Sequence, residues 1–164
     1  MAIYTKKGDK GKSSVLDGKR IPKSSPIFEA LGALDEVNSW LGVVGGFTKI
    51  QKDLIAISSI LAGAKLDFPA VKTKKLELEI DKLETKLPIL KGFIIPEGEG
   101  AKLHFARALI RRAERAVVSL HNSSFIIHNS ILMYLNRLSD YFFMLAGNKK
   151  HFSKIPGVSI YETS

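Results

Sequence analysis

The sequence contains no cysteine, one tryptophan and four histidines in 164 residues. The absence of cysteine excludes a disulfide framework, a thiol nucleophile and any cysteine-ligated zinc or iron–sulfur site. The histidines, His104, His121, His128 and His151, include no i,i+4 pair that could hold a metal from one helix face. Long apolar runs are also missing, because the uncharged stretch 116–136 is rich in Ser, His and Asn and does not suit a bilayer.

The N-terminus has no apolar targeting segment, so we expect a cytoplasmic protein that does not enter a membrane. The length fits a single domain, 1–164, and 45% hydrophobic residues can form a core without disulfides or a structural metal. Composition divides the chain into a Gly/Lys/Ser-rich arm (1–25), a helical part (26–149) and a short tail (150–164).

Apolar residues at steps of three and four dominate the middle of the chain and predict helices. The pair Ser25-Pro26 is typical of a helix start, and Gly45-Gly46 of a helix end. No segment shows a convincing strand pattern. The predicted fold is an all-α bundle of five helices with a basic N-terminal arm. The expected helices cover about residues 26–45, 50–66, 71–87, 101–120 and 124–149.

Basic residues outnumber acidic ones, with 25 Lys and Arg against 16 Asp and Glu and a formal net charge of +9. Such an excess favours an anionic partner, although it is also compatible with a lysine-rich surface. The arginines are concentrated, since five of the six lie between positions 107 and 137. Arginine is favoured where phosphate or carboxylate is bound by several donors at once, so this stretch is a candidate site.

The N-terminal arm carries Gly11-Lys12-Ser13, which is similar to the end of a phosphate-binding loop. A complete loop of that type needs a glycine where Lys6 stands, and it needs a buried strand before it, so that fold is not predicted. Glycine N–H groups, lysines and hydroxyls nevertheless suit a polyphosphate. The alternative is a flexible basic tail without a ligand.

A second basic segment lies in the fourth predicted helix. Helical spacing places Arg107, Arg111 and Glu114 on one face, and Arg112 and Arg115 beside them. The alternative is a solvated basic face, which is the more common fate of a charged run. The use of arginine in a lysine-rich chain favours a site.

Two acidic residues, Asp35 and Glu36, lie in the middle of the first predicted helix. A carboxylate near a core stripe requires a partner, and Arg107 or Arg111 could supply it within a chain or between subunits. The alternative is simple exposure, which we expect for Glu36.

The fifth predicted helix has Asn136 and Asp140 at i,i+4, where a structural hydrogen bond is the simpler interpretation. Phe93 lies in the loop before the arginine-rich helix. Its side chain could anchor that loop in the core or line a pocket for a large, flat, apolar ligand.

Several of these segments, in this order, resemble motifs of the PduO-type ATP:corrinoid adenosyltransferases. The similarity extends over nearly the whole chain. It is carried by residues 4–11 (YTKKGDKG), 19–23 (KRIPK), 29–39 (EALGALDEVNS), 111–115 (RRAER) and 136–141 (NRLSDY).

The resemblance implies a homotrimer of five-helix subunits with active sites between subunits. It implies transfer of the 5′-deoxyadenosyl group of ATP, with Mg²⁺, to cob(I)alamin, giving adenosylcobalamin and triphosphate. A reductase and an adenosylcobalamin-dependent enzyme are the implied partners. The cobalt would be the nucleophile, so the protein would orient the reactants and stabilise the leaving triphosphate.

The resemblance also implies roles for individual residues. Asp35 and Arg107 would form a salt bridge that couples subunit contact to the site, and these two residues together with Arg111 and Asn136 would be the catalytic set. Phe93 would press on the lower face of the corrinoid. ATP would be held by Thr5, Lys6, Lys7, Gly8, Ser13, Ser14 and Lys23 of one subunit and by Arg111, Arg112, Glu114, Arg115 and Asn136 of the next.

The chain departs from the family pattern in two places. Lys7 stands where the family usually has a small polar residue, and residues 96–98 read Pro-Glu-Gly instead of Pro-Gly-Gly. Two other functions remain open from the sequence. One is an ATP- or corrinoid-binding carrier without turnover. The other is a basic nucleic-acid-binding bundle, which the scarcity of aromatics among the basic residues disfavours.

Overall fold

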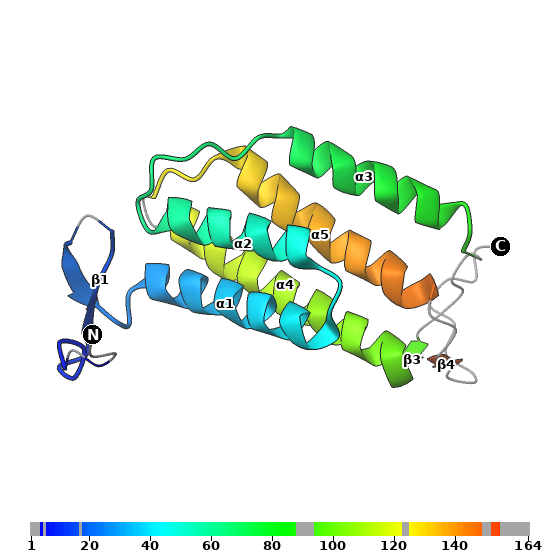
Figure 1. The fold of residues 1–164 in the computed structure, drawn as a ribbon, viewed down its shortest axis with the longest axis horizontal. Coiled ribbons are helices and arrows are strands. Elements are labelled where there is room, and N and C mark those ends of the chain that lie inside the picture. Colours follow the sequence, from blue (N-terminus) through cyan, green and yellow to red (C-terminus); the bar gives the residue numbers. More distant parts are fainter. Residues whose placement is uncertain are drawn as a thin grey trace.

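The computed structural model describes residues 4, 6–16, 18–87, 94–122, 125–148 and 152–154. Within these ranges the chain forms an elongated bundle of five helices with the N-terminal arm at one end (Figure 1). The predicted all-α class is therefore confirmed. The helices are α1 (Pro26–Val44), α2 (Thr48–Leu61), α3 (Val71–Glu84), α4 (Gly98–Asn122) and α5 (Asn129–Asn148).

The ends of α1 and α2 follow local signals. Pro26 occupies the first helical position and Ser25 precedes it, but the Ser25 side chain makes no capping hydrogen bond. Gly45 adopts a φ of 79° and donates its N–H to the carbonyl of Leu41, which ends α1. Gly63, at a φ of 109°, follows the end of α2, so this helix stops at Leu61 and not near residue 66 as expected.

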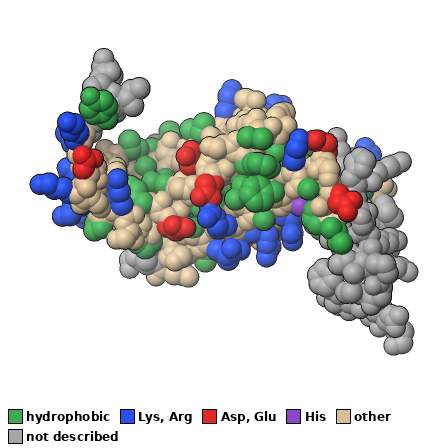
Figure 2. Space-filling view, turned by 90° about the horizontal axis from the view of Figure 1, so that it is seen from below, with side chains coloured by type: hydrophobic (Ala, Val, Ile, Leu, Met, Phe, Trp, Pro, Cys, Tyr) green, Lys and Arg blue, Asp and Glu red, His purple; other side chains and the backbone are tan. Residues whose placement is uncertain are grey.

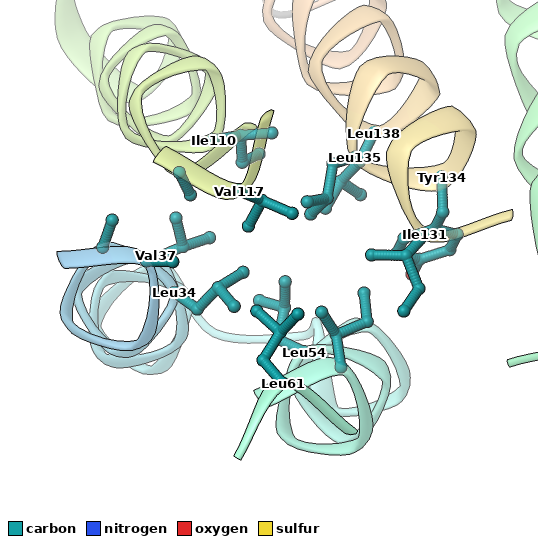
Figure 3. Packing of buried hydrophobic residues seen from close by; sticks show 14 of the residues in the cluster. Leu34, Val37, Leu54, Leu61, Ile110, Val117, Ile131, Tyr134, Leu135 and Leu138 are labelled. Atoms are coloured by element: carbon teal, nitrogen blue, oxygen red, sulfur yellow. The ribbon is translucent and has the colours of Figure 1, made fainter. Parts of the chain in front are cut away.

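Four helices, α1, α2, α4 and α5, surround the hydrophobic core (Figure 3). On α5, apolar residues at steps of three and four form the stripe that the sequence predicts, and Ile131, Leu135, Leu138 and Phe142 are fully buried. On α1 the same spacing predicts a stripe through Phe28, Leu31 and Asn38, but the buried residues include Ile27, Ala30 and Val37, about one position earlier. The labelled core residues are Leu34, Val37, Leu54, Leu61, Ile110, Val117, Ile131, Tyr134, Leu135 and Leu138.

The contact between α1 and α4 positions the arginine-rich segment. Both helices bury small side chains, Ala30 and Ala33 on α1 and Ala106 and Ala113 on α4. Small residues let two helix axes approach closely. The outer sides of α1 and α4 are thereby brought next to each other along the bundle.

The α3 helix packs mainly against α5 and contributes little to the core. Its buried side chains are Thr73 and Leu76. It therefore acts as an outer layer on one side of α5, which leaves a space between α3 and α2.

Short strands occur although no segment of the sequence showed a strand pattern. β1 (Lys12–Ser14) pairs antiparallel with β2 (Arg20–Pro22), and β3 (Ile94–Pro96) pairs antiparallel with β4 (Phe152–Lys154). Strands of three residues are too short to show a periodic pattern.

No helix in the described ranges is both long and apolar enough to cross a membrane.

Candidate active site

The β1–β2 hairpin and the residues that flank it contain the described arm residues predicted to bind ATP. The loop before it is closed by hydrogen bonds from Gly11 N–H to Gly8 O (3.2 Å) and from Lys23 N–H to Gly11 O (2.8 Å). A methyl group added at Gly8 would lie 3.2 Å from Lys23 Nζ, so the ammonium group of Lys23 lies against the backbone of the loop. Exposed lysines and small residues therefore share one compact turn.

Arg20 holds this turn together, a role that the sequence analysis did not predict. Its guanidinium donates to the carbonyl oxygens of Lys7 and Lys12. Ser13 is half-buried opposite Ile21, whereas Ser14 is exposed. Thr5 lies outside the described residues.

Four arginines of α4, Arg107, Arg111, Arg112 and Arg115, form an arginine ridge, and they differ in whether they pair with an acidic side chain. Arg112 forms an ion pair with Glu36 of α1, and its buried Nε has no hydrogen-bond partner among the described residues. Arg111 and Arg115 are exposed and form no ion pair within the described part of the chain. Figure 2 shows Lys and Arg side chains along the bundle, at a distance from the Lys and Arg side chains of the arm.

Asn136 Nδ2 donates a 3.0 Å hydrogen bond to Glu114 Oε1 and so joins α5 to α4. This confirms a structural hydrogen bond for Asn136, although its partner is Glu114 and not Asp140. Asn136 and Glu114 were both predicted to bind ATP, and the structure places them together beside the arginine ridge. This hydrogen bond holds Glu114 in place, and Glu114 forms no ion pair with Arg111 or Arg115 within the described chain.

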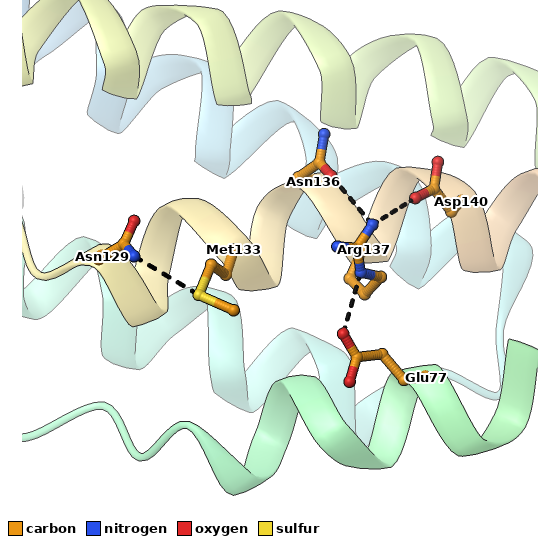
Figure 4. A network of polar contacts seen from close by, with 6 residues as sticks. All are labelled: Glu77, Asn129, Met133, Asn136, Arg137 and Asp140. Carbon is orange, nitrogen blue, oxygen red and sulfur yellow. Dashed lines mark hydrogen bonds and ion pairs between the residues drawn. The ribbon is translucent and has the colours of Figure 1, made fainter.

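Arg137 forms three hydrogen bonds within the protein (Figure 4). It donates to Glu77 of α3 (3.1 Å), to Asp140 (3.1 Å) and to Asn136 Oδ1 (3.2 Å). Hydrogen bonds to Glu77 and Asp140 raise the pKa of this guanidinium. Arg137 thus fixes the Asn136 amide and links α3 to α5.

Arg107 lies on the α5 side of α4, with its guanidinium carbon 5.2 Å from the ring centre of Phe143. Burial, and then the charge of Arg111, lower its pKa, while Asp140 acts in the opposite direction. An arginine remains protonated in such surroundings. The stacked arrangement is typical of a cation–π contact.

His104 completes this group, since its ring packs edge-on against Phe143 with centroids 6.2 Å apart. Burial and the nearby Arg107 lower its pKa, so the imidazole is neutral at pH 7. Neither His104 nor Phe143 was singled out from the sequence. Phe143 follows the core residue Phe142, and its position off the core stripe of α5 was the available signal.

Asp35 faces a different part of the molecule from Arg107. It lines a cavity of about 330 Å³ between α1 and α2, next to Asn38 and Leu16. No ion pair joins Asp35 to Arg107 within the described chain, and the in-chain partner of the arginine ridge is Glu36, which was expected to be merely exposed.

The arm and the ridge also stand apart within one chain. The hairpin extends beyond the N-terminal end of α1 (Figure 1), and Leu16 N–H anchors it to Ala62 O at the end of α2 (3.0 Å). Arg111 and Arg115 lie farther along the bundle on α4. Phe93 lies outside the described residues, and no group of three His, Asp or Glu residues able to hold a metal occurs within the described ranges.

Comparison with known proteins identifies the family. Residues 3–148 match the model of the cobalamin adenosyltransferase family. The corrinoid adenosyltransferase of Bacillus subtilis (strain 168) is 39% identical over 166 residues, which cover 89% of this chain and 85% of that protein. The corrinoid adenosyltransferase MMAB of Homo sapiens is 43% identical over 168 residues, which cover 88% and 67%.

Solved structures agree with this assignment. A variant PduO-type ATP:corrinoid adenosyltransferase from Lactobacillus reuteri, complexed with cobalamin and ATP, superimposes with a TM-score of 0.86 at 30% identity, covering 96% of this chain and 98% of that one. Another variant from the same organism, complexed with ATP, gives a TM-score of 0.81 at 35% identity, covering 89% and 93%. The motifs, the five-helix bundle and these matches together place the chain in the cobalamin adenosyltransferase family.

Proposed function

We propose that the chain transfers the 5′-deoxyadenosyl group of ATP to cob(I)alamin and releases adenosylcobalamin and triphosphate. Membership of the family supports the activity: the chain is a corrinoid adenosyltransferase, and hence a transferase. In this reaction the electron pair of Co(I) forms a bond to C5′, the C5′–O bond breaks, and its electron pair leaves on the triphosphate.

The observation that carries the proposal is the pair of unengaged guanidinium groups on α4. Arg111 and Arg115 are exposed and unpaired in the described chain, while Glu114 and Asn136 beside them are tied to each other. A polyanion gives such cations their missing partners. We assign to Arg111 the stabilisation of charge on the leaving triphosphate, which needs donors fixed before the reaction begins.

The arm supplies the second half of the proposed nucleotide site. Lys6, Lys7 and Lys23 surround a turn with exposed backbone, and Ser14 presents a hydroxyl at its edge. Lysines and N–H groups in this arrangement suit the phosphates of ATP. Mg²⁺ prefers phosphate oxygens and water, so we propose that it enters on the nucleotide as Mg-ATP.

A homotrimer brings the two halves together in this proposal. The arm of one subunit would lie against the ridge of the next, and Asp35 would meet the partner's Arg107. The separation of arm and ridge within one chain supports this arrangement. The Phe93 contact with the corrinoid, the reductase, the recipient enzyme and a cytoplasmic location stay predictions from the sequence.

The test combines purified protein, Mg-ATP and chemically reduced cobalamin. Loss of the cob(I)alamin absorption band together with one triphosphate per corrinoid is the expected result. ATP binding without triphosphate release would instead indicate a carrier. Binding of neither ligand, with salt-sensitive binding of DNA or RNA, would indicate a nucleic-acid-binding protein.

A further inference from the structure

A second, larger cavity lies between α2, α3 and α5, on the other side of α5 from the Arg107–Phe143 contact. Its volume is about 820 Å³, which is within the range of roughly 300–1,000 Å³ found for small-molecule sites. Tyr141 lines this cavity, whereas Phe143 lies against Arg107 of α4. Two residues along a helix differ by about 200° in direction, so the cavity and the candidate active site lie on opposite sides of α5.

The wall of the cavity is largely apolar and aromatic. Phe47 and Ile50 come from the start of α2, Leu76 from α3, and Tyr134 and Tyr141 from α5. Tyr134 donates its hydroxyl to Asp53 Oδ2 (2.9 Å), but the hydroxyl of Tyr141 has no partner in the described chain. Burial and the charge of Glu79 raise the pKa of Tyr141, so it remains a hydrogen-bond donor.

The charges around the cavity are unbalanced, with four lysines against two carboxylates. The carboxylates already have partners: Asp53 pairs with Lys72, and Glu79 with Lys82 (2.7 Å). The remaining lysines have no ion-pair partner among the described residues. They are Lys49, Lys52 and Lys75.

We propose that this cavity binds an amphipathic organic anion, a small molecule with an aromatic or apolar body and one carboxylate or phosphate group. The body would contact Phe47, Ile50 and Leu76. The anionic group would lie between Lys49 and Lys75 and accept a hydrogen bond from Tyr141. Lys49, Lys52 and Lys75 are exposed residues of the cavity lining, and their charge favours an anionic ligand over a neutral one. A bare inorganic anion would leave the apolar wall in contact with water.

The probe is 8-anilinonaphthalene-1-sulfonate, whose fluorescence rises on entering an apolar site, titrated into the full chain with saturating Mg-ATP present. The expected result is saturable binding that weakens about tenfold in Lys49→Glu/Lys75→Glu. Lys74→Glu is the matched control, because this exposed lysine is next to Lys75 but outside the cavity, and it should bind as the parent does. Val71→Trp, which fills the cavity from its exposed edge, should abolish binding.

Ligand chemistry gives the second arm of the test. 2-Naphthoate should displace the probe at least about tenfold better than neutral 2-naphthylmethanol. Equal displacement by the two, or unchanged probe binding in both Lys49→Glu/Lys75→Glu and Val71→Trp with native circular dichroism, would overturn the proposal. Neither readout depends on adenosyl transfer, so failure here leaves the proposed function untouched.

Discussion

Glu36 of α1 forms an ion pair with Arg112 of α4, whereas its neighbour Asp35 points toward α2 and has no ion-pair partner among the described residues. Successive residues on a helix are about 100° apart, so two adjacent acids serve different surfaces. Glu36 links two helices of one subunit. Asp35 is left for a contact outside that pair.

Asp35→Asn should therefore weaken subunit assembly, and Glu36→Gln should not. An exposed ion pair contributes roughly 0–1 kcal/mol, so Glu36→Gln should lower the unfolding free energy by less than about 1 kcal/mol. Sedimentation equilibrium measures assembly, and urea denaturation measures stability. The double substitution Asp35→Arg/Arg107→Asp exchanges the two charges and should assemble as the parent does. Weakened assembly of this variant would count against the proposed pair.

Arg111→Ala should reduce turnover by about 10²–10³-fold, the usual effect of removing one donor that stabilises charge in the transition state. The bundle should keep its stability because Arg111 is exposed and makes no ion pair in the described chain. Lys102→Ala is the control, since Lys102 is an exposed α4 cation whose ion-pair partner is Glu99. Full activity in Arg111→Ala would remove the role assigned to this residue.

Arg20→Ala should open the turn of the arm, because it removes the donor to the Lys7 and Lys12 carbonyls. We expect the KM for ATP to rise by about tenfold, the equivalent of losing one charged hydrogen bond, with little change in melting temperature. Lys10→Ala is the matched control, an exposed cation of the same arm. Limited proteolysis gives an independent measurement: Mg-ATP should protect the arm of the parent, and equal cleavage with and without it would contradict the proposed site.

Stability should fall at alkaline pH because of Tyr134. Burial, and then Asp53, raise the pKa of this phenol well above its usual value of 10.0. The folded state therefore retains a proton that the unfolded chain loses above pH 10, and the unfolding free energy decreases as pH rises from there. Tyr134→Phe should cost about 1–3 kcal/mol near pH 8 through the lost bond to Asp53.

The same substitution should flatten the decline above pH 10. Urea denaturation at several pH values between 8 and 11 would show it. An equally steep decline in Tyr134→Phe would assign the effect to other groups, among which Tyr141 also has a raised pKa.

The helices could be predicted because apolar residues repeat at the spacing that places them on the buried side of a helix, as the fully buried Ile131 and Leu138 illustrate. The hairpin could not, since pairing of Ser13 with Ile21 depends on contacts between separated three-residue segments. Helical spacing predicts that the arginines of α4 lie next to one another, but it does not predict which of them pairs with an acidic side chain. Which of Glu36 and Asp35 reaches Arg112 depends on the rotation of α1 about its axis. The apolar spacing predicted a buried side of α1 that differs from the observed one by about one residue.

The α5 helix has a different neighbour on each side over three consecutive positions. Tyr141 borders the cavity toward α3, Phe142 is buried in the core beside Phe47, and Phe143 meets Arg107 of α4. Inserting one residue before Tyr141 would turn everything after it by about 100° and exchange all three environments together. The length of α5 is thus under tighter constraint than the identity of any one of its exposed residues, and changes in chain length should be accommodated outside it.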